Sequence, residues 1–122
     1  MEKHVLLIED EPNIAEAIRF ILSRDGWQVS HEADGSRALA RVRDLRPDLV
    51  ILDHMLPGLS GLEILAALRA DPATAAIRVL MLTARGQGRD REAAVAAGAD
   101  RFMIKPFSNA DILAEVRAMM EP

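Results

Sequence analysis

The chain has 122 residues, a formal net charge of −4 and no cysteine. This length allows one ordinary buried core, and the lack of cysteine excludes disulfides and thiolate metal sites. The acidic balance argues against nonspecific nucleic-acid binding by the bulk surface. The first apolar run, residues 5–8, is too short for a signal peptide or a membrane span. We therefore expect one cytoplasmic domain over residues 1–122.

Strand and helix patterns alternate along the whole chain. Short runs rich in Val, Ile and Leu predict buried parallel strands, and periodic apolar positions predict the helices between them. The expected strands are 3–8, 28–33, 49–52, 78–82 and 101–104. The expected helices are 12–25, 36–46, 61–70, 90–97 and a last one capped by Ser108. Five such units predict a doubly wound α/β fold, whose five-stranded parallel sheet has strand order 2-1-3-4-5.

Chemically active side chains follow four of the predicted strands. Glu9 and Asp10 come after the first, Asp53 after the third, Thr83 after the fourth and Lys105 after the fifth. Ligands of open α/β sheets bind beyond the carboxyl ends of the strands, at the switch point of strand order. We therefore expect all five to meet at one edge of the sheet.

The five residues together favour a phosphoryl-transfer site that uses Mg²⁺. Crowded carboxylates repel unless a cation neutralises them, and Mg²⁺ takes carboxylate, water and phosphate oxygens. Each residue alone has a plainer explanation: a solvated acidic loop or helix cap, a β-branched strand end, or a surface lysine. The following Pro106 holds Lys105 in extended backbone and permits a cis bond. A lysine held in this way would pair with Asp53 at rest and with a phosphoryl oxygen after reaction.

Four segments carry a resemblance to a known family. They are residues 6–12 (LLIEDEP), 48–58 (DLVILDHMLPG), 81–85 (MLTAR) and 98–107 (GADRFMIKPF). Over essentially its whole length the chain resembles the response-regulator receiver domains of two-component signalling, which are CheY-like proteins with a flavodoxin-like (βα)5 fold. The resemblance implies a phosphorylation-switched signalling domain and not an enzyme, since such a domain promotes only its own phosphotransfer and dephosphorylation.

The resemblance also implies roles for the acidic residues. Asp53 would accept a phosphoryl group from a phosphohistidine of a histidine kinase or phosphotransfer protein, and this partner would dock on the first helix. Glu9, Asp10 and Asp53 would hold Mg²⁺, with the backbone carbonyl of Met55 as a further ligand. Phosphoryl transfer mainly needs in-line positioning and neutralised charge, which is what this set supplies.

Further residues correspond to the switch of the family. Lys105 would contact the phosphoryl group, and Thr83 would hydrogen-bond it once it has formed. Movement of Thr83 would leave space for Phe102, the switch aromatic, to rotate inward. Phe102 lacks a hydroxyl, so its inward state would depend on packing alone. Met55 and Arg85 hold variable positions that control how water reaches the aspartyl phosphate, and their bulk predicts a persistent phosphorylated state.

The predicted fourth helix, fifth strand and fifth helix form a candidate dimer face. Receivers of the winged-helix DNA-binding class resemble this chain closely there and dimerise through ion pairs. Here Arg101 and Glu115 reverse one usual pair, and Ala96 replaces a usual acidic partner of Arg117. We expect one of two outcomes. The chain either self-associates weakly without forming mixed dimers with ordinary receivers of that class, or it is a monomer with a solvated face. The candidate residues are Arg91, Arg101, Asp111, Glu115 and Arg117.

The three histidines are expected at the surface. His54 directly follows the acceptor, and neighbouring residues of an extended chain face opposite sides, so its ring should point away from Asp53. His4 and His31 have no supporting sequence context. Direct binding of nucleic acid or membrane is not expected, because residues 121–122 leave no room for a helix-turn-helix after the last helix.

Two other functions remain open at this point. One is a phosphate-independent interaction module that has lost the switch. The other is a hydrolase with an aspartyl-phosphate intermediate, although such enzymes place an acid where Met55 stands. The sequence fits a stand-alone regulator and a receiver of a longer protein equally, and it identifies neither the kinase nor the stimulus.

Overall fold

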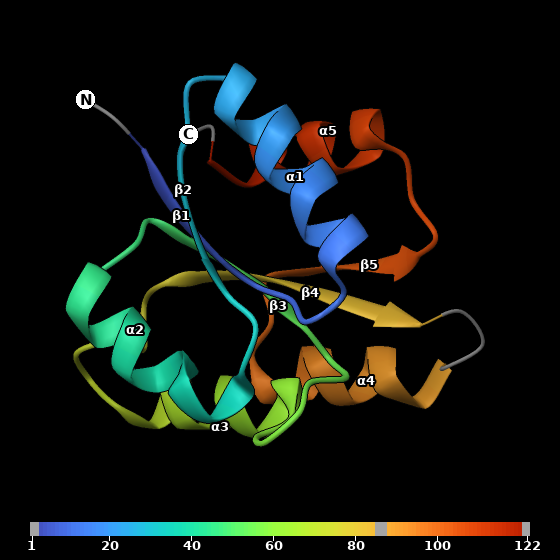
Figure 1. The fold of residues 1–122 in the computed structure, drawn as a ribbon. Helices are drawn as coiled ribbons and strands as arrows, with labels where there is room; N and C mark the ends of the chain where they lie inside the picture. Colours follow the sequence, from blue (N-terminus) through green and yellow to red (C-terminus); the bar gives the residue numbers. More distant parts are fainter. Residues whose placement is uncertain (1–2, 85–87, 121–122) are drawn as a thin grey trace.

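The computed structural model describes residues 3–84 and 88–120, in which parallel strands alternate with helices (Figure 1). The strands are β1 (His4–Ile8), β2 (Gln28–Glu32), β3 (Leu49–Asp53), β4 (Arg78–Ala84) and β5 (Arg101–Lys105). The helices are α1 (Pro12–Arg24), the 3-10 turn η1 (Gly35–Arg37), α2 (Ala38–Leu45), α3 (Gly61–Ala70), α4 (Gly88–Ala97) and α5 (Asn109–Met120). Within the described ranges, no helix combines the length and apolar character needed to cross a membrane.

The sheet has the order β2-β1-β3-β4-β5, and all neighbouring strands are parallel. This confirms the predicted strand order and the doubly wound α/β fold. Helices α1 and α5 cover one face of the sheet, and α2, α3 and α4 cover the other (Figure 1). β2 is added on one side of β1, whereas β3 and the later strands are added on the other side. The carboxyl ends of β1 and β3 therefore lie side by side at the switch point of strand order.

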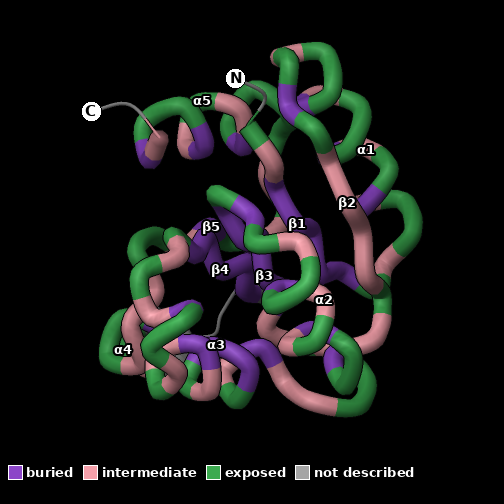
Figure 2. The backbone as a smooth tube through the Cα atoms, turned by 90° about the vertical axis from the view of Figure 1, so that its left-hand side faces the viewer, coloured by how far each residue is buried: buried purple, intermediate pink, exposed green. Residues whose placement is uncertain are grey.

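The two faces of the sheet belong to two separate cores. Val5 and Leu7 of β1 pack with the buried residues of α1 and α5, whereas Leu6 and Ile8 pack with those of α2, α3 and α4. Figure 2 shows the buried central strands, with exposed segments on the outer sides of the helices. All of β3 is buried, which explains its continuous apolar run, since strands covered on both faces need no polar side.

Side-chain caps fix the helices that follow the strand ends. Ser60 and Glu63 form a reciprocal capping box at the start of α3. Ser108 caps α5, as predicted, because its hydroxyl accepts from the N–H of Asp111 while the Asp111 carboxylate accepts from the N–H of Ser108. At α1, the Glu11 carboxylate accepts a backbone N–H in the first turn. These caps hold the loops at the carboxyl edge of the sheet.

Several strands extend further than the sequence pattern indicated. β4 continues to Ala84 and β5 to Lys105, because Thr83 pairs with Ile104 and Ala84 pairs with Lys105. Asp53 is likewise the last residue of β3. Asp53, Thr83 and Lys105 are therefore held by the strands of the sheet and not by loops. The expected second helix begins one residue early as the 3-10 turn η1 before it becomes α2.

Candidate functional site

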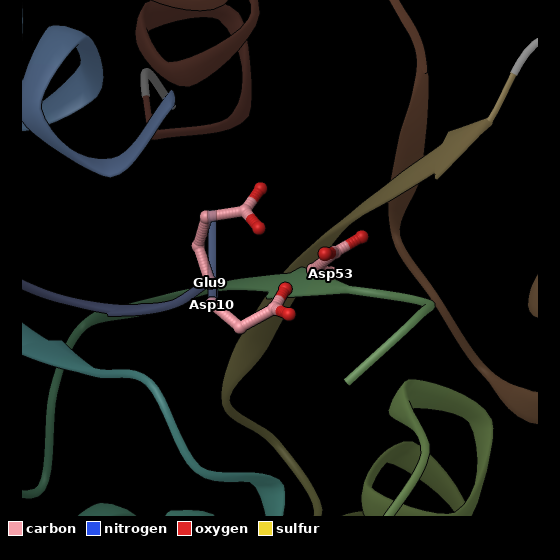
Figure 3. A group of neighbouring side chains, drawn as sticks. All are labelled: Glu9, Asp10 and Asp53. Atoms are coloured by element: carbon pink, nitrogen blue, oxygen red, sulfur yellow. The ribbon is translucent and has the colours of Figure 1, made fainter. Parts of the chain in front are cut away.

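Three carboxylates meet at the carboxyl edge of the sheet. One ligand oxygen from each of Glu9, Asp10 and Asp53 lies within 4.8 Å of the others (Figure 3). The register that pairs Ile8 with Leu52 brings the end of β1 beside the end of β3. Glu9 and Asp53 are buried, and Asp10 is exposed. The predicted juxtaposition of the three acids is confirmed.

Lys105 reaches this cluster from β5. Its Nζ atom lies 2.9 Å from Glu9 Oε1 and 3.1 Å from Asp53 Oδ1. The predicted pairing with Asp53 is confirmed, but the contact with Glu9 was not anticipated, because sequence position alone does not say how far a lysine reaches across two strands. The Lys105–Pro106 peptide bond is cis.

Burial and charge shift the pKa values of Glu9 and Lys105. Burial raises the pKa of the Glu9 carboxyl, and its contact with Asp53 raises it further, while Lys105 acts in the opposite direction. Burial alone would lower the pKa of Lys105, but the hydrogen bond to Glu9 and the nearby carboxylate charges outweigh it and raise that pKa. The lysine is therefore held as a cation between two buried acids.

The loop after Asp53 is held close to the site by backbone hydrogen bonds. The N–H of Met55 points to Asp53 Oδ1 at 3.4 Å, while the Met55 side chain is exposed. The N–H of Gly61 donates to the carbonyl of His54 at 3.0 Å. A Cβ on Gly61 would lie 2.3 Å from the backbone oxygen of Asp53, so glycine is required for this approach. The start of α3 thus packs directly against Asp53.

The acidic cluster fits a hard divalent cation. Oxygen ligands around Mg²⁺ in octahedral geometry lie about 3–4 Å from one another, and the three carboxylates have a comparable spacing. Two of the three donors are on buried residues, where an uncompensated negative charge is costly. The donor set therefore suits Mg²⁺, and Lys105 supplies part of the neutralising charge beside it.

Sequence comparison identifies the family. The model of the response regulator receiver domain matches residues 5–117. The chain belongs to this family. It is 39% identical over 120 residues to the DNA-binding response regulator MtrA of Mycolicibacterium smegmatis, and 40% identical over 116 residues to the phosphate regulon transcriptional regulatory protein PhoB of Rhizobium meliloti. The matches cover 98% and 95% of this chain but 51% of each relative, so the chain spans about half the length of the curated relatives it matches.

Solved receiver structures have the same fold. The chemotaxis response regulator CheY4 of Vibrio cholerae superposes with a TM-score of 0.92 at 28% identity, covering 98% of this chain and all of that chain. The BeF3-activated N-terminal receiver domain of RstA from Klebsiella pneumoniae gives a TM-score of 0.90 at 27% identity, again over 98% of this chain and 100% of the other. The protein is thus a receiver domain of two-component response regulators with a CheY-like fold.

The two residues predicted to form a switch lie on β4 and β5. Thr83 is buried, and its hydroxyl donates to the carbonyl of Met103 at 3.5 Å, the long limit of a hydrogen bond. Phe102 is half-buried, packs on the α4 side of the sheet and lines a surface hollow with Val95. Arg85, the predicted lifetime residue, lies outside the described residues.

Three charged residues of the predicted dimer face form ion pairs within the receiver: Arg101, Glu115 and Arg117. Arg101 pairs with Glu115 at 3.0 Å. Arg117 pairs with Asp25, at the end of α1, which supplies the acidic partner that α4 lacks. Asp111 is engaged in the cap of α5, and the side chain of Arg91 lies outside the described part. Arg101 and Glu115, whose charges are reversed relative to the usual pair, therefore satisfy each other within a single chain.

The three histidines are less exposed than the sequence predicted. His54 is half-buried and its Nε2 atom is buried. His4 and His31 are half-buried as well, with Nε2 of His4 at 2.7 Å from Ser30 Oγ and Nε2 of His31 at 2.7 Å from the carbonyl oxygen of Glu9. Sequence reasoning missed His31 as a neighbour of the site. The available signal was its place near the end of β2, the strand that flanks β1.

Proposed function

We propose that residues 1–122 form one receiver domain that accepts a phosphoryl group on Asp53 from a phosphohistidine of a histidine kinase or phosphotransfer protein. The observation that carries this proposal is the buried Asp53 carboxylate, 3.1 Å from the Lys105 ammonium and beside two further acids. The domain promotes its own phosphorylation and dephosphorylation and turns over no separate substrate. The exposed face of α1, with Asn13, Glu16 and Arg19, is the proposed docking surface for the donor.

The reaction is a phosphoryl transfer between two side chains. An oxygen of Asp53 forms the new O–P bond while the P–N bond of phosphohistidine breaks, and its electron pair stays on the imidazole nitrogen. Lys105 holds a fixed positive charge where the phosphoryl oxygens arrive. Glu9, Asp10, Asp53 and the carbonyl of Met55 would hold Mg²⁺, which supplies further positive charge to those oxygens when bound. After transfer, the negative charge lies on the phosphoryl oxygens, further from the Asp53 backbone than the carboxylate was. We expect the Lys105 ammonium to shift its contact from the carboxylate to these oxygens.

The readout of phosphorylation begins at Thr83. Its resting hydrogen bond to Met103 is long and weak, whereas a phosphoryl oxygen is a charged and stronger acceptor. We expect the Thr83 hydroxyl to turn to the phosphoryl group and Phe102 to move inward beside it. Phosphorylation would in this way change the α4–β5–α5 face. Phe102→Ala should leave phosphorylation intact but uncouple that change.

The output is proposed to be a protein contact through the α4–β5–α5 face. The relatives MtrA and PhoB are named as DNA-binding and transcriptional regulators. We propose that this receiver itself contacts no DNA or membrane, acts in the cytoplasm, and signals to a protein partner, to an output domain, or to a second copy. Arg101 and Glu115 already pair within one chain. In a homodimer, this ion pair would either break and form again between the two copies or take no part in the interface. Either case supports weak and selective self-association.

The test is intact-mass measurement after incubation with a small phosphodonor and Mg²⁺, followed by light scattering. We expect an addition of about 80 Da that disappears with EDTA and in Asp53→Asn. Asp44→Asn is the matched control, since Asp44 is an exposed acid on α2. No addition with any donor would favour the phosphate-independent module, and sustained turnover of a phosphate ester would favour a hydrolase. Dimerisation on phosphorylation would support the homodimer.

A further inference from the structure

The pairing of β1 with β2 stops at the acidic site. The last register pair is Ile8 with Glu32, and the N–H of Glu9 still donates to the carbonyl of Glu32 at 3.0 Å. In a parallel ladder the next bond would run from the N–H of Asp34 to the carbonyl of Glu9. The N–H of Asp34 donates instead to the Glu32 carboxylate at 3.1 Å. The ladder therefore leaves the Glu9 carbonyl without its backbone partner.

The imidazole of His31 takes this place. Its Nε2 atom lies 2.7 Å from the Glu9 carbonyl oxygen. A carbonyl oxygen only accepts hydrogen bonds, so Nε2 must carry the proton. Arg41 of α2 donates to the backbone carbonyl of His31 at 3.3 Å and also lies 3.7 Å from the Glu32 carboxylate. The end of β2 is thus braced by α2 while its histidine holds the end of β1.

The held carbonyl belongs to the peptide that leads into Asp10. Its orientation sets the direction in which the backbone presents the Asp10 side chain. Within residues 3–84 and 88–120, no hydrogen bond or ion pair holds the Asp10 carboxylate, so the backbone must position it. We infer that His31 is a positioning residue of the acidic cluster, acting on Asp10 through the Glu9 carbonyl. This inference rests on the proposed function of that cluster as a Mg²⁺ site.

The first test measures Mg²⁺ affinity without any phosphodonor. The Mg²⁺ titration is followed by the NMR amide shifts of Asp10 and Asp53. We expect His31→Leu to weaken binding about tenfold, as loss of a group that orients a metal ligand does. His31→Gln keeps an N–H donor at a similar reach and should bind within about twofold of wild type. Equal affinity of His31→Leu and wild type, or no rescue by glutamine, would overturn the inference.

His4→Leu is the matched control. His4 is also half-buried and its ring also bonds across β1 and β2. It lies at the start of β1, at the opposite end of the strand from the acidic site, and its partner Ser30 lies in the middle of β2. Its replacement should leave Mg²⁺ affinity unchanged. Thermal unfolding of each variant checks that it is folded. A loss of affinity in both histidine variants would show a general effect of strand pairing and would also overturn the specific role of His31.

A metal-free measurement separates this inference from the proposed function. The imidazole ¹⁵N shifts of His31 should show the Nε2–H tautomer, and the ¹⁵N shift of the Asp10 amide should change in His31→Leu and return towards wild type in His31→Gln. An Nδ1–H tautomer, or an unchanged Asp10 amide, would overturn the positioning role. The His31 tautomer and the Asp10 amide shifts could behave as expected while wild type neither binds Mg²⁺ nor accepts a phosphoryl group. In that case the proposed function fails, and the hydrogen bond from His31 to the Glu9 carbonyl has a structural role only.

Discussion

Lys105 and Glu9 form an ion pair of 2.9 Å in which the carboxylate is fully buried, while the lysine side chain keeps 22% of its exposure. Removing the cation would leave buried negative charge without compensation. We expect Lys105→Met to lower the free energy of unfolding of the metal-free protein by about 2–3 kcal/mol, at the low end for a broken buried pair because the lysine is partly solvated. Urea denaturation followed by the fluorescence of Trp27, the single tryptophan, measures this change.

A double-mutant cycle tests whether the cost arises from Glu9. When Glu9→Gln is combined with Lys105→Met, part of the loss should be recovered, because Asp53 is then the only one of the two acids paired with Lys105 that still carries an uncompensated buried charge. Arg37→Met is a suitable control, since Arg37 pairs with Glu32 at 3.7 Å while mostly exposed and should cost less than about 1 kcal/mol. Strict additivity of the two site substitutions would contradict the coupling.

Metal addition should stabilise the fold through the same carboxylates. At a free Mg²⁺ concentration ten times the dissociation constant, the free energy of unfolding should rise by about 1.4 kcal/mol. EDTA should reverse the change, and Asp10→Asn should abolish it without harming the fold, because Asp10 is exposed. Asp44→Asn should respond like wild type. Stabilisation that persists in Asp10→Asn would place the ion elsewhere.

The arrangement of the backbone could be predicted from sequence because periodicity encodes it. The runs around Ile8, Leu52 and Leu82 are apolar without interruption, which only strands covered on both faces tolerate. Parallel strands joined by helices then bring their carboxyl ends to one edge, so Asp53 and Glu9 had to be neighbours. The same logic gave the strand order, which the structure confirms.

The details that could not be predicted depend on where strand pairing stops and how far side chains reach. The carbonyl of Glu9 is available to His31 only because the N–H of Asp34 turns to a carboxylate. Likewise, Arg117 meets Asp25 because α1 and α5 pack on the same face, although 92 residues separate the two. No periodic pattern records such contacts, and histidine in a strand carries no signal of its own.

Gly61 should be intolerant of a side chain. A Cβ there would meet the backbone oxygen of Asp53 at 2.3 Å, a contact with the main chain that no rotamer change relieves. We expect Gly61→Ala to cost about 1–3 kcal/mol of stability and to slow phosphorylation by displacing the acceptor. Gly26→Ala is the comparison, because Gly26 has a φ of +92° but open space around it. That variant should lose stability yet phosphorylate at the normal rate.

The ion pair of Arg117 with Asp25 should make a small, pH-dependent contribution to stability. The hydrogen bond from Arg117 lowers the pKa of the Asp25 carboxyl below its ordinary 3.8. The folded state then holds this proton less tightly than the unfolded state, so the contribution is present above about pH 4 and is lost as the pH falls through the lowered pKa. Arg117→Gln should cost about 0.5 kcal/mol at neutral pH, since the arginine is largely exposed.

NMR titration of the Asp25 carboxyl carbon checks this prediction directly. Its pKa should return towards the ordinary value in Arg117→Gln, and the stability difference between variant and wild type should shrink in high salt. A pKa that is the same in both proteins would show that the ion pair does not persist in solution.

Met55 should influence how long the phosphorylated state lasts. Its side chain is 67% exposed and stands two residues beyond Asp53, the proposed acceptor. We propose that a bulky apolar group at this position hinders the approach of water to the aspartyl phosphate. We expect the variant Met55→Asn/Arg85→Ala to shorten the lifetime of phospho-Asp53, because a smaller, polar site admits a hydrolytic water. The decay of the phosphorylated mass after removal of the donor measures it. An unchanged lifetime would contradict the role of both residues.

The two cores divide the receiver into compartments that share only the backbone of the sheet. Leu6 and Leu7 are adjacent in sequence, yet they pack against different helices on opposite faces. Substitutions that repack the compartment beneath α1 therefore need no compensating change beneath α4. We expect the outer surface of α1 to diversify among descendants independently of α4, so that input and output specificities can be exchanged separately by grafting residues from other receivers.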